Sequence, residues 1–147
     1  MSNATGKVMV GALEVCDLPE LQVSGLEMRV DTGAQTSSLH VDNIEPFRRG
    51  GEQWLRFDIH PDVHNVEEVV RREARVQAVR WVKSSSGHRQ KRYMIEMQFR
   101  IAGMTWPILV TLSDRTDMTY LMLLGREAMT GRLTVDPEHE FLVSEAP

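Results

Sequence analysis

The sequence of 147 residues contains a single cysteine, Cys16. One thiol cannot form an internal disulfide, so the composition is compatible with a reducing compartment. No stretch approaches the ~18 consecutive apolar residues of a membrane span, and no basic-then-apolar signal peptide opens the chain. These absences predict no membrane association and favour the cytoplasm. Residues 2–4 resemble a cloning scar, so a removed leader stays an open alternative.

A strong excess of one charge is also missing. Lys and Arg number 17 and Asp and Glu number 21, and the resulting net charge of −4 gives no reason to expect a nucleic-acid partner. Apolar content of 41% and charged content of 26% are ordinary for a soluble globular protein. We therefore expect a flexible N-terminus or tag at residues 1–7 and a single domain over residues 8–147.

Signatures of metal and nucleotide sites are absent as well. The sequence has no His-Glu-x-x-His and no Gly-x-x-x-x-Gly-Lys-Ser/Thr. Among the five histidines only His60 and His64 have ligand-like spacing, and Pro61 between them argues against a shared helical face. We expect no metal and no cofactor, and we expect His40 to hydrogen-bond to nearby backbone.

The most informative stretch that is present surrounds Asp31. Residues 26–30 alternate apolar and charged side chains, as a half-buried strand does, and this strand leads into Asp31-Thr32-Gly33-Ala34. Thr32 can hydrogen-bond to the neighbouring backbone, while Gly33 allows close approach of another chain segment. Asp31 is thus a candidate reactive carboxylate. Because Asp and Gly are common turn residues, a plain turn is the alternative.

A second segment favours the reactive carboxylate. Residues 120–124 form an apolar strand that ends in Gly125-Arg126, about ninety positions after the Asp-Thr-Gly motif, and helix-forming residues follow. Together with Ser84-Ser85-Ser86-Gly87 and Val135-Asp136, these motifs resemble the bacterial retropepsin-like aspartic proteases. The branch most similar is the RimB-like family, often labelled "ATP-dependent zinc protease". The resemblance covers roughly four-fifths of the chain, from Met28 to about Val143.

The resemblance implies an all-β fold, the small closed barrel of the retroviral-type aspartic proteases, with one short helix. Short, closely spaced strands and a helix between Arg126 and Gly131 predict the same class independently. In this family the strand carrying Leu123, Leu124, Gly125 and Arg126 passes beneath the aspartate loop and supports it. The hairpin over residues 75–101 would be the flap, with its tip at Ser84, Ser85, Ser86, Gly87 and His88. An ordinary exposed hairpin explains the same pattern.

Several local expectations follow from the pattern alone. The clearest strand covers residues 93–101, with residues 106–112 as its hairpin partner. Residues 41–51, which contain Pro46 and two glycines, are expected to form a loop, and so is most of 62–74. Residues 133–135 and 141–143 are expected to form a closing hairpin.

Aspartic proteolysis needs two carboxylates at one water, and the pair shares a proton because like charges so close cannot both ionise. This chain has one Asp-Thr-Gly motif. The chemistry therefore predicts a homodimer in which each chain contributes one Asp31. In retroviral enzymes the arginine of the Gly-Arg pair contacts an acidic residue four positions after the aspartate. Here that residue is Gln35, so Arg126 needs another partner.

A different class of function stays open, namely a catalytically inactive barrel that binds peptides or a partner. Relatives resembling this chain are associated with ATP-grasp glutamate ligases, which suggests an acidic or glutamate-tailed peptide or protein substrate. Six arginines between residues 71 and 92 can pair with such a substrate, although they also fit an ordinary solvated surface. They are Arg71, Arg72, Arg75, Arg80, Arg89 and Arg92.

Overall fold

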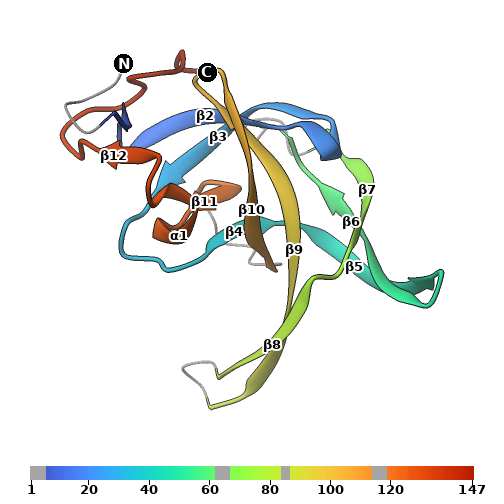
Figure 1. Cartoon of the computed structure of the whole chain (residues 1–147). Coiled ribbons are helices and arrows are strands. Elements are labelled where there is room, and N and C mark those ends of the chain that lie inside the picture. Colours follow the sequence, from blue (N-terminus) through green and yellow to red (C-terminus); the bar gives the residue numbers. More distant parts are fainter. Residues whose placement is uncertain (1–5, 62–66, 84–86, 114–118) are drawn as a thin grey trace.

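A closed barrel of six strands forms the centre of the molecule (Figure 1). The computed structural model describes residues 6–61, 67–83, 87–113 and 119–147. Around the barrel the strand order is β10-β4-β11-β3-β2-β9, and β9 pairs again with β10 to close the ring. The strands are β2 (Leu13–Leu18), β3 (Val23–Val30), β4 (Ser37–His40), β9 (Arg89–Ile101), β10 (Met104–Ser113) and β11 (Met122–Leu124). The predicted all-β barrel is confirmed.

Smaller elements extend the barrel. An antiparallel sheet of β5 (Asp42–Arg49), β6 (Glu52–Ile59) and β7 (Val70–Arg75) lies to one side (Figure 1). Strand β8 (Ala78–Lys83) pairs with the first part of β9. Strand β1 (Val8–Val10) runs parallel to β12 (Leu133–Val135). The helices within the described ranges are the 3-10 turn η1 (Pro19–Leu21) and the predicted short helix α1 (Arg126–Met129).

Alternating apolar side chains of the barrel strands form the core. In β9, Ile95, Met97 and Phe99 are at most 2% exposed, as the alternation of residues 93–101 predicts. The ring of Phe99 meets that of Trp106 edge-on, with centroids 5.2 Å apart. Burial of each such side chain contributes about 1.5–3 kcal/mol, so the barrel wall is a rigid support for any loop attached to it.

Two segments expected to be loops are strands. Residues 42–49 form β5, in which Pro46 lies opposite Leu55. Strand β5 is at the edge of its sheet, where a residue without an N–H is tolerated, and Gly50-Gly51 form the turn into β6. Residues 70–74, also expected to lie in a loop, belong to β7 (Val70–Arg75). Of the remainder of that loop, residues 67–69 form no strand or helix, and residues 62–66 lie outside the described part of the chain.

The expected closing hairpin is wrong. Strand β12 pairs with β1, and residues 141–143 form no strand. They are bound instead by the carboxylate of Glu14, which is fully buried and accepts hydrogen bonds from the N–H groups of Leu142 (2.8 Å) and Val143 (3.3 Å). The hydroxyl of Ser144 (2.6 Å) and the N–H of Gly11 (2.8 Å) complete its shell. The Glu14 side chain, together with the hydrogen bond from the Phe141 N–H to the Leu13 carbonyl (2.8 Å), therefore anchors the C-terminal segment.

Candidate active site

Asp31 follows directly after the last residue of β3 and is half-buried. Its N–H donates to the carbonyl of Leu124 (2.9 Å), which ties the loop to β11. Its carboxylate oxygen Oδ1 accepts from the N–H of Gly33 (2.9 Å), and its carbonyl accepts from the N–H of Ala34 (3.2 Å). Thr32 and Gly33 are exposed beside it. The loop thus holds one carboxylate in a defined orientation at the surface of the barrel.

Strand β11 lies between the two strands that enter and leave this loop. It runs parallel to β3, with Leu124 opposite Val30, and antiparallel to β4, with Leu123 opposite Ser38. Because β11 pairs on both edges, it fixes the distance between the two ends of the loop. The structure therefore places the strand before Gly125 against the Asp31 loop, as the sequence motifs predict.

Gly125 is in the closest contact in the site. A Cβ atom at this position would lie 2.5 Å from the carbonyl carbon of Thr36 and 2.6 Å from its oxygen. The N–H of Gly125 donates to the hydroxyl oxygen of Ser37 (3.0 Å), a side chain that is 2% exposed. Glycine is required here by close packing of two backbones, not by an unusual backbone angle.

Helix α1 holds the second half of the loop. The N–H groups of Arg126 and Glu127 donate to the carbonyls of Ala34 (2.8 Å) and Gln35 (3.1 Å). Arg126 finds its partner in the carbonyl of Gly33, 3.3 Å from Nη1. The amide of Gln35 donates to the Glu127 carboxylate (2.6 Å). The link between loop and helix is thus a bond from the neutral amide of Gln35 to the carboxylate of Glu127. The resemblance to retroviral enzymes implies an acidic residue at position 35 paired with the arginine at 126.

Sequence reasoning missed two residues of this site. Ser37 and Glu127 make specific contacts with Gly125 and Gln35, yet neither stands out in a local pattern. Ser37 lies in a run of small polar residues, and only its burial distinguishes it from its neighbours as a site residue. That burial results from packing against β11, which is far away in the sequence, so the local sequence does not reveal it.

A cavity of about 200 Å³ lies between the end of the loop and the predicted flap hairpin. Its lining comprises Thr36, Ser37, Ser38 and Thr111 on the barrel side and Arg80 and Arg92 on the hairpin side. Arg80 and Arg92 are directly opposite each other on β8 and β9. Two like charges in this position repel, so an anion in the cavity would relieve that repulsion.

Parts of the predicted flap tip are not described. Ser84, Ser85 and Ser86 lie outside the described residues, whereas Gly87 and His88 are exposed at the start of β9. Gly87 has a φ of +87°, a conformation that suits glycine and fits a tight turn.

The expectation for His40 is wrong. Its side chain is not bonded to backbone within the described residues. Nε2 lies 3.4 Å from the Asp42 carboxylate, and buried Nδ1 has no partner there. Asp42 also contacts Nε2 of His60 at 2.6 Å.

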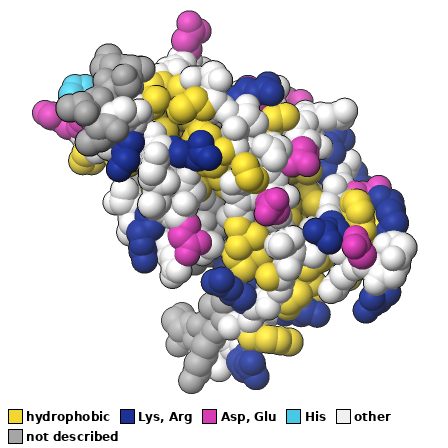
Figure 2. Space-filling view, in the orientation of Figure 1, with side chains coloured by type: hydrophobic (Ala, Val, Ile, Leu, Met, Phe, Trp, Pro, Cys, Tyr) yellow, Lys and Arg dark blue, Asp and Glu magenta, His cyan; other side chains and the backbone are white. Residues whose placement is uncertain are grey.

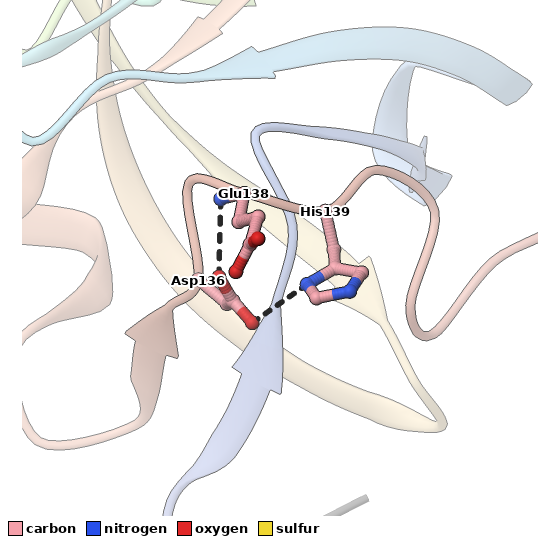
Figure 3. A group of neighbouring side chains, drawn as sticks. All are labelled: Asp136, Glu138 and His139. Atoms are coloured by element: carbon pink, nitrogen blue, oxygen red, sulfur yellow. Dashed lines mark hydrogen bonds and ion pairs between the residues drawn. The ribbon is translucent and has the colours of Figure 1, made fainter.

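Three potential ligating residues meet elsewhere, after β12. Asp136, Glu138 and His139 place one ligand atom each within 4.8 Å of one another (Figure 3). The Asp136 carboxylate accepts from the Glu138 N–H (3.0 Å) and contacts Nδ1 of His139 (2.8 Å). These bonds lower the pKa of Asp136, and the one to His139 contributes most. They are also the bonds by which an aspartate stabilises a turn, so a turn alone explains why the three side chains lie close together. Their chemistry suits a metal, but within the described residues their side chains make no hydrogen bond to the Asp31 loop.

The barrel, the inserted β11 and the aspartate loop define a retropepsin-like protein. Residues 9–146 match the RimB-like family, described as retropepsin-like aspartic endopeptidase RimB. The chain belongs to this family. A solved structure from Legionella pneumophila, of a protein with unknown function, is similar with a TM-score of 0.76 and 27% identity. The similarity covers 92% of this chain and 97% of that one.

Curated relatives carry a different description. A probable alpha-L-glutamate ligase from Parasynechococcus marenigrum is 47% identical over 91% of this chain and 29% of its own length. Another, from Shewanella pealeana, is 42% identical over 95% of this chain and 30% of its own length. The chain therefore spans about three-tenths of the curated relatives it matches. None of the helices among the described residues has the length and apolarity needed to cross a membrane.

Proposed function

We propose that this chain is an aspartic endopeptidase that acts as a homodimer, with one Asp31 from each chain at a shared water. The observation that carries the proposal is the Asp31 loop, held by β11 on one side and by α1 on the other. In the dimer, the ionised Asp31 takes a proton from the water while the protonated one polarises the scissile carbonyl. Family membership supports the fold on which this chemistry depends.

The substrate we propose is an acidic peptide, such as a glutamate-tailed protein. Support comes from the cavity beside the loop, where Arg80 and Arg92 face the hydroxyl-bearing residues Thr36, Ser38 and Thr111. Two guanidinium groups and several hydroxyls suit a carboxylate side chain, which would bridge the opposed charges. The β8–β9 hairpin would act as the flap that covers this peptide.

We propose that the protein is located in the reducing environment of the cytoplasm. Cys16 is 2% exposed, and its burial, together with nearby Asp17, raises the pKa of its thiol well above the usual range. Such a thiol stays protonated, and a single cysteine forms no internal disulfide, so this residue is compatible with a reducing compartment.

A second candidate is a binding module without catalysis. The names of the curated relatives are consistent with it, because they describe probable ligases in which the matched region is only about three-tenths of the protein. In that case the same groove would hold an acidic peptide or a ligase partner without cleaving it.

The test is the substitution Asp31→Asn, which keeps the size of the side chain but removes the carboxylate. Cleavage of a glutamate-tailed peptide, followed by mass spectrometry, should fall by at least about 100-fold, as expected when a general base is lost. The matched control is Glu96→Gln, which removes an exposed carboxylate from β9. Unchanged cleavage in Asp31→Asn would exclude the protease. Wild-type protein that binds the peptide but never cleaves it would favour the binding module.

The arginine pair has its own test. Arg80→Gln and Arg92→Gln should each raise KM for the glutamate-tailed peptide by about 10-fold or more, since hydrogen bonds to charged groups contribute about 1.5–3 kcal/mol. Cleavage of a peptide without acidic residues should be unaffected. Equal losses on both peptides would contradict a carboxylate subsite. Arg75→Gln, which replaces an arginine already paired with Glu52, is the control.

A further inference from the structure

The charge of the molecule is unevenly distributed. We call residues 78–83 and 89–94 the arm, because β8 and the start of β9 extend away from the barrel (Figure 1). The arm contains five Lys and Arg residues and none of the 21 Asp and Glu residues. The net charge of −4 predicts no nucleic-acid partner for the chain as a whole, but the arm alone is strongly basic.

The two faces of the arm differ. Arg80 and Arg92 lie on the face that lines the cavity beside Thr36, Ser37 and Ser38. The cross-strand pairs Val79–Tyr93 and Trp81–Lys91 lie on the other face, because side chains of a strand alternate between its sides. We call this second face the outer face.

Rings and cations alternate on the outer face. The guanidinium of Arg89 lies 5.1 Å from the ring centre of Trp81, and the ammonium of Lys91 lies 5.2 Å from that of Tyr93. Trp81 is 58% exposed and Val79 is 37% exposed, so the indole is a large apolar surface open to solvent. Figure 2 shows hydrophobic and basic side chains, without acidic ones, at the bottom of the molecule, where the arm lies.

The cations of the outer face are not neutralised. Within the described residues, neither Arg89 nor Lys91 forms an ion pair. Several arginines of the adjacent sheet behave differently, since Arg71 pairs with Glu45 and Asp58, and Arg75 pairs with Glu52. Arg72 of the same sheet bonds instead to the carbonyls of Leu21 and Arg71. Positive charge is therefore retained on the arm and partly neutralised beside it.

We infer that the outer face of the arm binds single-stranded nucleic acid. A single strand alternates phosphates with planar bases, and the outer face alternates cations with rings in the same way. A base would stack on Trp81 while Arg89 and Lys91 contact the flanking phosphates. An acidic peptide would satisfy the cations but would leave the exposed part of the Trp81 indole open to solvent, so nucleic acid fits the whole face better.

Binding is tested with a fluorescein-labelled single-stranded RNA of 12 nucleotides and full-length protein, by fluorescence anisotropy. Two phosphate contacts predict a slope of about −1.4 for log K against log salt, at about −0.7 per phosphate. Trp81→Ala should weaken binding roughly 5- to 150-fold, the range for one stacked base. Arg71→Gln, which replaces a paired arginine, should change affinity less than about 2-fold.

Tryptophan fluorescence gives a second readout. Of the three tryptophans, Trp106 is 4% exposed and Trp54 on β6 is half-buried, whereas Trp81 is 58% exposed. RNA should therefore quench Trp81 most strongly, and Trp81→Phe should abolish most of the quenching while retaining affinity. A 12-residue polyglutamate is the competing probe. Tighter binding of polyglutamate than of RNA, or RNA affinity that is unchanged in Trp81→Ala, would overturn the inference, as would no RNA binding at low salt. All measurements can be repeated in Asp31→Asn, which separates them from the proposed peptidase activity.

Discussion

Gly125 shows how closely the backbones of the site are packed. Its α-carbon lies against the carbonyl of Thr36, so the loop after Asp31 and the end of β11 share the space that a methyl group would need. Gly33 differs, because the atom nearest to an added Cβ there is Oδ1 of Asp31, at 3.1 Å, which belongs to a side chain that can move. We therefore expect a side chain at Gly125 to reduce the stability of the barrel, and a side chain at Gly33 to change the orientation of the Asp31 carboxylate.

Gly125→Ala should destabilise the protein by about 1–3 kcal/mol, because the clash is with backbone that cannot yield without moving β4. Urea denaturation measures the change. Gly33→Ala is the matched comparison, and it should cost less stability while still reducing peptide cleavage. If Gly125→Ala were as stable as the natural protein, β11 would not be in close contact with the loop.

Some site residues can be predicted from the sequence because their motif is local. Asp31 and Gly33 lie in one short segment, and the apolar pair before Gly125 marks a strand that ends in a close approach. Ser37 and Glu127 are different, since each is informative only through a partner about ninety positions away. A single sequence does not predict which distant residue will contact a given serine in the folded protein.

At the scale of elements, the three-stranded sheet is held by charged side chains as well as by its ladders. Asp58 on β6 accepts hydrogen bonds from Asn43 on β5 (2.8 Å) and from Arg71 on β7 (2.8 Å), so one carboxylate connects all three strands. These bonds lower the pKa of Asp58, and the one from Asn43 contributes most. The sheet therefore depends on Asp58 remaining ionised.

A lowered pKa in the folded protein means that the unfolded chain binds the proton first as pH falls. The stabilisation from Asp58 is thus complete above the unfolded pKa of about 3.9 and is lost as pH decreases through the folded value. Asp58→Asn should lower Tm at pH 7, and the difference from the natural protein should shrink below about pH 4. Thermal unfolding followed by circular dichroism between pH 2 and 7 measures this. A Tm difference that stays constant across the range would refute the role of Asp58.

Failures of prediction at this scale have physical causes. Pro46 suggested a loop at residues 41–51, but an edge strand tolerates proline because one side of it has no ladder partner. The apolar runs at 133–135 and 141–143 suggested a hairpin. Phe141 has a φ of +55°, however, and the buried carboxylate of Glu14 binds the segment that follows. Alternation predicts a strand, but it does not identify the partner.

At the scale of the whole molecule, one chain provides one Asp31, so the proposed activity depends on association. Specific cleavage activity should therefore decrease on dilution below the dissociation constant of the dimer. Excess Asp31→Asn protein, mixed with natural protein, should suppress activity by forming mixed dimers that lack one carboxylate. Analytical ultracentrifugation gives the association constant to compare with the activity curve. Activity proportional to protein concentration over the range in which the dimer dissociates would contradict the shared site.

The position of β11 also affects when the Asp31 loop can fold during synthesis of the chain. Strands β3 and β4 leave the ribosome early, but the space between them is filled by residues 122–124, which are synthesised more than eighty residues later. Pairings so distant in sequence form slowly and only after the intervening chain exists. Until Leu124 and Gly125 emerge, Asp31 has neither the carbonyl that fixes its loop nor the glycine that fits beneath it. In a nascent chain with this topology the Asp31 loop is therefore unsupported until residues 124 and 125 have been synthesised, so the order of the strands delays the proposed activity.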